Sequence, residues 1–104
     1  MVVGIGIDII EISRIKKAIE SSSFVGRVFT ESEQLYCNAR GNQRAASYAA
    51  RFAAKEAFVK ALGTGFIGGT WHDIEIVVNE QGRPDVKLTG FFAAEAQKRG
   101  IARI

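Results

Sequence analysis

The chain has 104 residues, of which 47% are hydrophobic, and this size and composition predict one folded domain over 1–104 rather than a disordered segment. A net charge of +3 suits anionic substrates but is too small to demand a nucleic acid partner. The single cysteine, Cys37, excludes a disulfide framework and fits a reducing compartment. Asp8 interrupts the N-terminal apolar run well short of the roughly 20 residues that span a bilayer, so we expect a cytoplasmic protein without membrane insertion.

The stretch GIGIDIIEI, residues 4–12, predicts a β-strand with one carboxylate in an apolar run. Alternation along a strand places Asp8 on one face with Gly4, Gly6 and Ile10, so that this face is almost bare. Glycines in a strand often mark the close approach of a ligand, and a lone buried carboxylate is costly unless it is paired or bound to a metal. We therefore expect a group from outside this stretch to lie against Asp8.

An amphipathic helix is expected after this strand. Ile12, Ile15 and Ile19 recur at helical spacing, while basic residues fill much of the opposite side. The serine run 21–23 is expected to end this helix, and 24–29 to form a short connection.

Two further helices are expected in the middle of the chain. Thr30 and Glu33 match the capping-box pattern, which predicts a helix from there to about Asn38. The longest helix is expected over 43–62, with Gly63 placed to end it.

The C-terminal third predicts a hairpin and a last helix. The glycine-rich stretch 65–70 is interpreted as a plain loop, because phosphate-binding loops precede a helix and this one follows one. Strands are expected over 73–78 and 84–88, joined by turn residues, and a helix over 90–99.

The segment RFAAKEAFVKALGTG, residues 51–65, has the most informative helix surface. Phe52, Glu56 and Lys60 fall in one i, i+4 row. On helix statistics alone, Glu56 and Lys60 would form an ordinary surface ion pair. The presence of Asp8 suggests instead that two carboxylates share a magnesium ion completed by phosphates and water, with Lys60 facing those phosphates.

Four stretches of the chain together resemble the holo-acyl carrier protein synthases, the small bacterial phosphopantetheinyl transferases. They are GIGIDIIEISRI, RVFTESE, RFAAKEAFVKALGTG and DIEIVVNEQGRPDVKL, and they match in order and spacing over nearly the whole chain. The resemblance implies transfer of 4′-phosphopantetheine from coenzyme A to a serine of apo-acyl carrier protein in fatty acid biosynthesis, with release of adenosine 3′,5′-bisphosphate. The fold is expected to be α+β, with a long helix packed on a mostly antiparallel sheet, and the resemblance implies a homotrimer with active sites between subunits.

The resemblance also implies that Asp8 and Glu56 are the magnesium ligands. Glu56, directly or through a metal-bound water, is then the candidate base for the carrier serine. Lys60 would hold the phosphates.

Two further sets of residues are expected to bind substrates. The residues assigned to coenzyme A are Arg51, Gly63, Thr64 and Pro84; for Arg51, a solvated helix charge is the alternative. Acyl carrier proteins are acidic, so the basic residues Arg14, Lys17 and Arg27 are expected to dock the carrier, with a merely solubilising role as the alternative.

Members of the family usually continue past the last helix into a strand with a serine-x-serine-histidine type motif and a closing strand. This sequence stops at Ile104, so it is either part of a longer chain, which we expect, or a shortened variant. A non-catalytic coenzyme A-binding or oligomerisation module is the alternative function. A nucleic-acid-binding protein is disfavoured, because the phenylalanines do not interleave with arginines as a stacking platform would.

Overall fold

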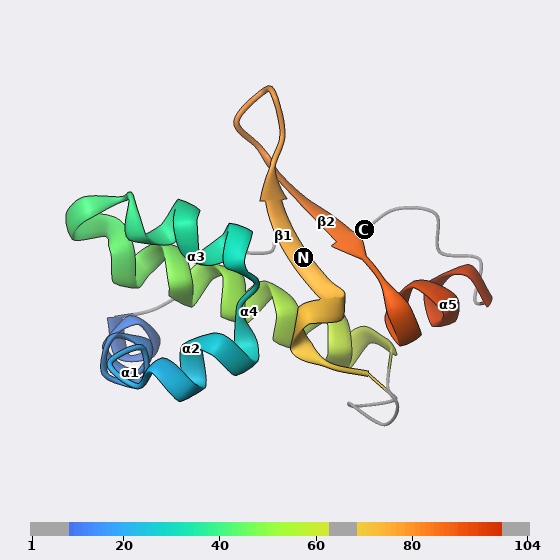
Figure 1. Ribbon diagram of the computed structural model, residues 1–104, viewed down its shortest axis with the longest axis horizontal. Coiled ribbons are helices and arrows are strands. Elements are labelled where there is room, and N and C mark those ends of the chain that lie inside the picture. The colour runs from blue at the N-terminus through green and yellow to red at the C-terminus, as the bar shows by residue number, and fades with distance from the viewer. Residues whose placement is uncertain (1–8, 63–68, 99–104) are drawn as a thin grey trace.

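The first half of the chain is helical, and the second half adds a β-hairpin and one more helix (Figure 1). The computed structural model describes residues 9–62 and 69–98. In chain order the elements are α1 (Ile9–Ala18), α2 (Ser22–Val28), α3 (Glu31–Asn38), the 3-10 turn η1 (Gly41–Gln43), α4 (Arg44–Leu62), the 3-10 turn η2 (Trp71–Asp73), β1 (Ile74–Val78), β2 (Pro84–Leu88) and α5 (Gly90–Lys98). The expected α+β class is confirmed.

The strand predicted over 4–12 is wrong at its described end, because residues 9–12 form the first turn of α1. An alternating pattern and a helical pattern overlap in this short apolar run, and periodicity alone does not separate them. Packing does: Ile15 and Ile19 are buried in the core, and Ile12 packs against the same cluster. Residues 1–8, including Asp8, lie outside the described part of the chain.

The connection predicted over 24–29 is also wrong, because Ser22–Val28 form the short helix α2. α1 ends at Ala18, a few residues before the serine run expected to end it. The run instead begins α2, since the Ser21 hydroxyl accepts the backbone N–H of Phe24 at 3.3 Å. Val25 and Val28, one helical turn apart in α2, are both buried.

The predicted starts of the two central helices are confirmed to within about a residue. The Thr30 hydroxyl accepts the Glu33 N–H at 3.2 Å, and Glu33 Oε1 accepts the Thr30 N–H at 2.8 Å, which completes the capping box of α3. α4 begins at Arg44, directly after η1.

The long helix packs on an antiparallel sheet, as expected. β1 and β2 pair in the register Ile74↔Leu88 to Val78↔Pro84, and Pro84 begins its strand as predicted. Phe58 of α4, Ile74 of β1 and Phe92 of α5 form one buried apolar cluster, with the two phenylalanine rings 6.0 Å apart. This cluster joins the hairpin and the last helix to α4.

A larger apolar cluster joins the four helices of the first half. Phe29 and Tyr48 lie at its centre, both fully buried, with ring centroids 4.7 Å apart in an edge-on arrangement. Its buried members are Ile15, Ile19, Val25, Val28, Phe29, Cys37, Tyr48 and Ala49. The cluster holds α1 and α2 against α4, and these three helices form the pocket described below.

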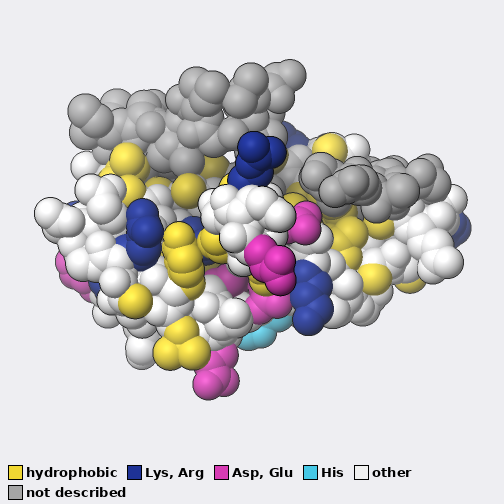
Figure 2. Space-filling model, turned by 90° about the horizontal axis from the view of Figure 1, so that it is seen from above, with side chains coloured by type: hydrophobic (Ala, Val, Ile, Leu, Met, Phe, Trp, Pro, Cys, Tyr) yellow, Lys and Arg dark blue, Asp and Glu magenta, His cyan; other side chains and the backbone are white. Residues whose placement is uncertain are grey.

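The surface seen in Figure 2 mixes side chains of both charges, with apolar side chains visible between them. In the described ranges, none of the helices combines the length and the apolar character needed to cross a bilayer.

Candidate active site

The charged side chains in the middle of α4 divide between the interior and the surface. Arg51 is 7% exposed and Lys55 is completely buried, whereas Glu56 and Lys60 are exposed. Glu56 and Lys60 lie one helical turn apart, as predicted. These two described residues form no ion pair with each other, so the surface pair suggested by helix statistics is absent.

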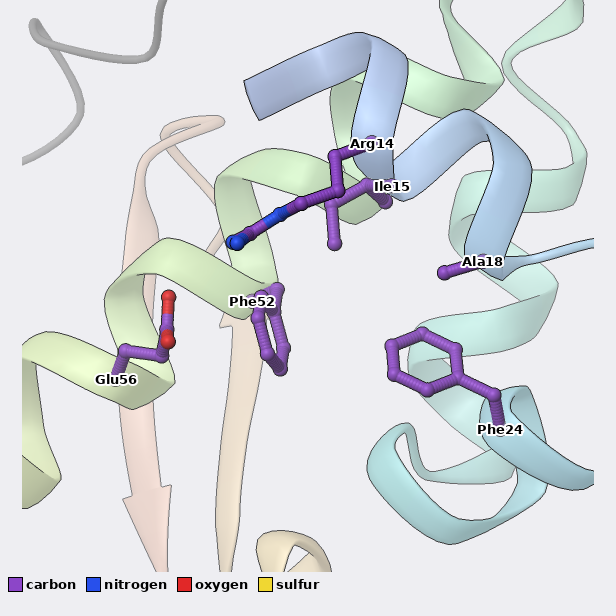
Figure 3. Close-up of a pocket in the computed structure, with 6 residues that line it drawn as sticks. All are labelled: Arg14, Ile15, Ala18, Phe24, Phe52 and Glu56. Atoms are coloured by element: carbon purple, nitrogen blue, oxygen red, sulfur yellow. The ribbon is translucent and has the colours of Figure 1, made fainter. Parts of the chain in front are cut away.

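Glu56 lines a pocket of about 300 Å³ between α1, α2 and α4 (Figure 3). Figure 3 shows the Arg14 side chain extending from α1 toward the part of α4 that carries Phe52 and Glu56. The lining residues are Arg14, Ile15, Ala18, Phe24, Phe52 and Glu56. An apolar pocket with one basic and one acidic side chain can hold a group that has both apolar and polar parts.

The residues predicted to dock a carrier protein lie around this pocket or on the same helix. Arg14 lines the pocket together with Phe24, and the guanidinium carbon of Arg27 lies 6.0 Å from the centroid of the Phe24 ring. Lys17 is exposed on α1. The structure therefore brings Arg14 and Glu56 to one pocket, which the spacing of the sequence did not indicate.

Arg51 is not the solvated helix charge that one interpretation of the sequence allowed. Its guanidinium carbon lies 4.3 Å from the centroid of the Tyr36 ring, and Nη1 donates to the Ser47 carbonyl at 3.3 Å. Its buried Nε has no hydrogen-bond partner within the described ranges. Contacts with Tyr36 of α3 and with the Ser47 carbonyl of α4 thus hold the Arg51 side chain in place.

A buried ion pair between Lys55 and Glu33 was not found by sequence reasoning. Lys55 Nζ lies 2.7 Å from Glu33 Oε1, and both side chains are completely buried. Burial lowers the pKa of Lys55, and the hydrogen bond and charge of Glu33 oppose that shift. Helical spacing could have indicated that Lys55 is buried, because it lies seven residues after Tyr48 and three before Phe58, on the buried face of α4.

Of the remaining predicted site residues, those that the structure describes do not line the pocket. Lys60 and Pro84 are exposed and are not among the lining residues. Asp8, Gly63 and Thr64 lie outside the described residues. Within 9–62 and 69–98, no group of three or more His, Cys, Asp or Glu side chains is arranged to hold a metal ion.

The chain belongs to the 4′-phosphopantetheinyl transferase superfamily, whose family model matches residues 4–102. Its curated relatives include the holo-[acyl-carrier-protein] synthase of Desulforudis audaxviator, which is 49% identical over the whole chain and 80% of its own length. The enzyme of the same name from Brucella ovis is 52% identical over 94% of the chain and 75% of its own length.

Solved structures show the same fold. The chain superposes on the crystal structure of holo-[acyl-carrier-protein] synthase from Neisseria meningitidis with a TM-score of 0.76 and 33% identity, covering 88% of this chain and 75% of that one. For the holo-ACP-synthase of Plasmodium yoelii the TM-score is 0.66 and the identity 28%, over 88% of this chain and 72% of that one.

Proposed function

We propose that this protein is a holo-[acyl-carrier-protein] synthase. It transfers 4′-phosphopantetheine from coenzyme A to a serine of apo-acyl carrier protein and releases adenosine 3′,5′-bisphosphate. The observation that supports this most directly is the match of 94–100% of this chain to 75–80% of the length of relatives of that name. Glu56, the residue proposed to act in catalysis, lies exposed at a pocket between three helices.

In the reaction, the serine oxygen forms a bond to the phosphorus next to the pantetheine group, and the diphosphate bond to the leaving bisphosphate breaks. Glu56 accepts the serine proton, directly or through a water molecule. Lys60, exposed one turn further along α4, contributes a positive charge for the phosphates.

Magnesium is proposed as the cofactor, with Asp8 and Glu56 as ligands. Glu56 fits this role, because its carboxylate is exposed and carboxylate oxygens are ligands that magnesium prefers. Bound there, the ion would neutralise negative charge on the diphosphate. Asp8 directly precedes α1, the helix whose Arg14 lines the pocket with Glu56.

The carrier protein is proposed to dock over the pocket. Arg14 lines the pocket together with Phe24, and Arg27 lies against the Phe24 ring, so an acidic surface carrying one apolar side chain would find both positive charge and an apolar recess. Lys17 extends the basic side of α1. This placement would bring the carrier serine near Glu56.

Several narrower features are proposed on the same basis. The coenzyme A contacts are proposed at Arg51, Gly63, Thr64 and Pro84, and the unpartnered Nε of Arg51 supports an anionic ligand there. A homotrimer is proposed, and the exposed apolar side chains of Leu35, Tyr36 and Val78 offer surface for a neighbouring subunit. The cytoplasm is the proposed location and fatty acid biosynthesis the proposed pathway.

The test is transfer by the purified chain. The protein is incubated with coenzyme A, magnesium and an apo-acyl carrier protein, and the carrier is examined by intact mass spectrometry. A mass gain of one phosphopantetheine group, matched by release of adenosine 3′,5′-bisphosphate, is expected. Binding of coenzyme A without transfer would favour the alternative of a non-catalytic module.

A further inference from the structure

The buried ammonium group of Lys55 lies where four segments of the chain meet. Nζ donates to the Val28 carbonyl at the end of α2 at 2.8 Å, to Glu33 Oε1 of α3 at 2.7 Å and to the Trp71 carbonyl of η2 at 3.2 Å. An ammonium group has three protons to donate, so all three are used. α4 is thereby joined to α2, α3 and η2 at one atom.

Both carboxylate oxygens of Glu33 also accept hydrogen bonds. Oε1 accepts the N–H of Thr30 at 2.8 Å in addition to Lys55, and Oε2 accepts the N–H of Ile76 in β1 at 2.8 Å. The bond between Ile76 and Glu33 connects residues 43 positions apart in sequence. The carboxylate therefore links β1 and the start of α3 to Lys55 of α4.

Lys55 directly precedes Glu56, and successive side chains on an α-helix differ by a fixed rotation of about 100°. Holding Lys55 inward therefore holds Glu56 at the pocket (Figure 3). The ring of Phe52, which also lines the pocket, lies 5.3 Å from that of Trp71, whose backbone carbonyl accepts a hydrogen bond from Lys55 Nζ. One set of hydrogen bonds thus fixes both pocket residues of α4.

We propose that Glu33 and Lys55 are positioning residues, which fix the rotation of α4 so that Glu56 and Phe52 face the pocket. The inference rests on the proposed catalytic role of Glu56. Buried ion pairs are weak sources of net stability, because desolvation offsets their attraction, yet their hydrogen bonds are directional. The pair therefore matters more for the orientation of α4 than for the stability of the fold.

Lys55→Met is the first test, because methionine has similar length and removes only the donor group. At a temperature where circular dichroism shows the variant folded, kcat per folded molecule is expected to fall at least tenfold. Phe92→Leu is the matched control: it perturbs a completely buried side chain in the other apolar cluster and should leave kcat per folded molecule unchanged. Wild-type kcat in folded Lys55→Met would overturn the proposal.

Glu33→Gln completes a double-mutant cycle with Lys55→Met. If the two residues act as one positioning unit, the double variant loses no more of kcat than Lys55→Met alone. Independent losses that multiply would overturn the proposal. If Lys55→Met fails to fold, kcat per folded molecule is compared between Glu33→Gln and wild type instead. If neither variant folds, the pair is needed for folding, and the proposal that it positions α4 is overturned.

Amide hydrogen exchange gives a readout that does not depend on transfer activity. Folded Lys55→Met should exchange at least tenfold faster over residues 52–58, with the start of α4 unchanged, while Phe92→Leu should not. Unchanged exchange over 52–58 would overturn positioning. If the wild-type chain transfers no phosphopantetheine, the proposed function fails, and the exchange measurement still decides the role of the pair.

Discussion

Removing the hydroxyl of Thr30 should destabilise the protein more than the loss of an ordinary helix cap. Its oxygen accepts the Glu33 N–H at 3.2 Å, and the same hydroxyl donates to Glu75 Oε2 of β1 at 2.5 Å. Loss of a cap costs about 1 kcal/mol. A hydrogen bond to a charged group adds about 1.5 kcal/mol. Because Glu75 is only partly buried, water recovers some of this, so we expect Thr30→Ala to lower the free energy of unfolding by about 2 kcal/mol.

Urea unfolding followed by the fluorescence of Trp71, the single tryptophan, measures this change. Thermal unfolding should show a Tm lower by about 10 °C, given about 4–8 °C per kcal/mol for a domain of this size. Thr30→Ser is the matched control, because it keeps the hydroxyl, and it should lie within about 0.5 kcal/mol of wild type. A loss below about 0.5 kcal/mol in Thr30→Ala, or an equal loss in Thr30→Ser, would contradict a stabilising role of the Thr30 hydroxyl.

Three further predictions concern the pocket and the core. Glu56→Gln should lower turnover at least about 100-fold, equivalent to about 2.7 kcal/mol, yet leave the urea midpoint unchanged because the side chain is exposed; near-wild-type turnover would contradict its role. Arg14→Glu should raise the KM for the carrier protein several-fold and flatten its salt dependence, with the KM for coenzyme A as the control; a carrier KM that stays constant at low salt would place the docking surface elsewhere. Burial raises the pKa of the Cys37 thiol to about 11 from an ordinary value of 9.0, which lowers the thiolate fraction at pH 8 about 100-fold. Alkylation by iodoacetamide should therefore be at least that much slower in the native protein than in urea, and rapid native labelling would show the thiol to be accessible.

Interactions between neighbours in sequence could be predicted from the sequence alone. The Thr30 and Glu33 capping box joins residues three positions apart, so its pattern can be recognised without any knowledge of packing. The hairpin was predictable for the same reason, since Asn79 accepts N–H groups from Gln81 and Arg83 within its own turn. The exposed row of Glu56 and Lys60 follows directly from helix geometry.

The tertiary structure decided which side chains meet across the helices. Sequence spacing put Arg14 on an outward-facing docking side, whereas packing of α1 against α4 places it at the same pocket as Glu56. Arg51 lies against Tyr36 only because α3 folds beside α4. The bond between Lys55 and Glu33 joins residues 22 positions apart, and no local pattern encodes a contact whose two halves are brought together only by the core. Burial makes that contact decisive, because a lysine ammonium completely removed from water requires a partner for each of its protons.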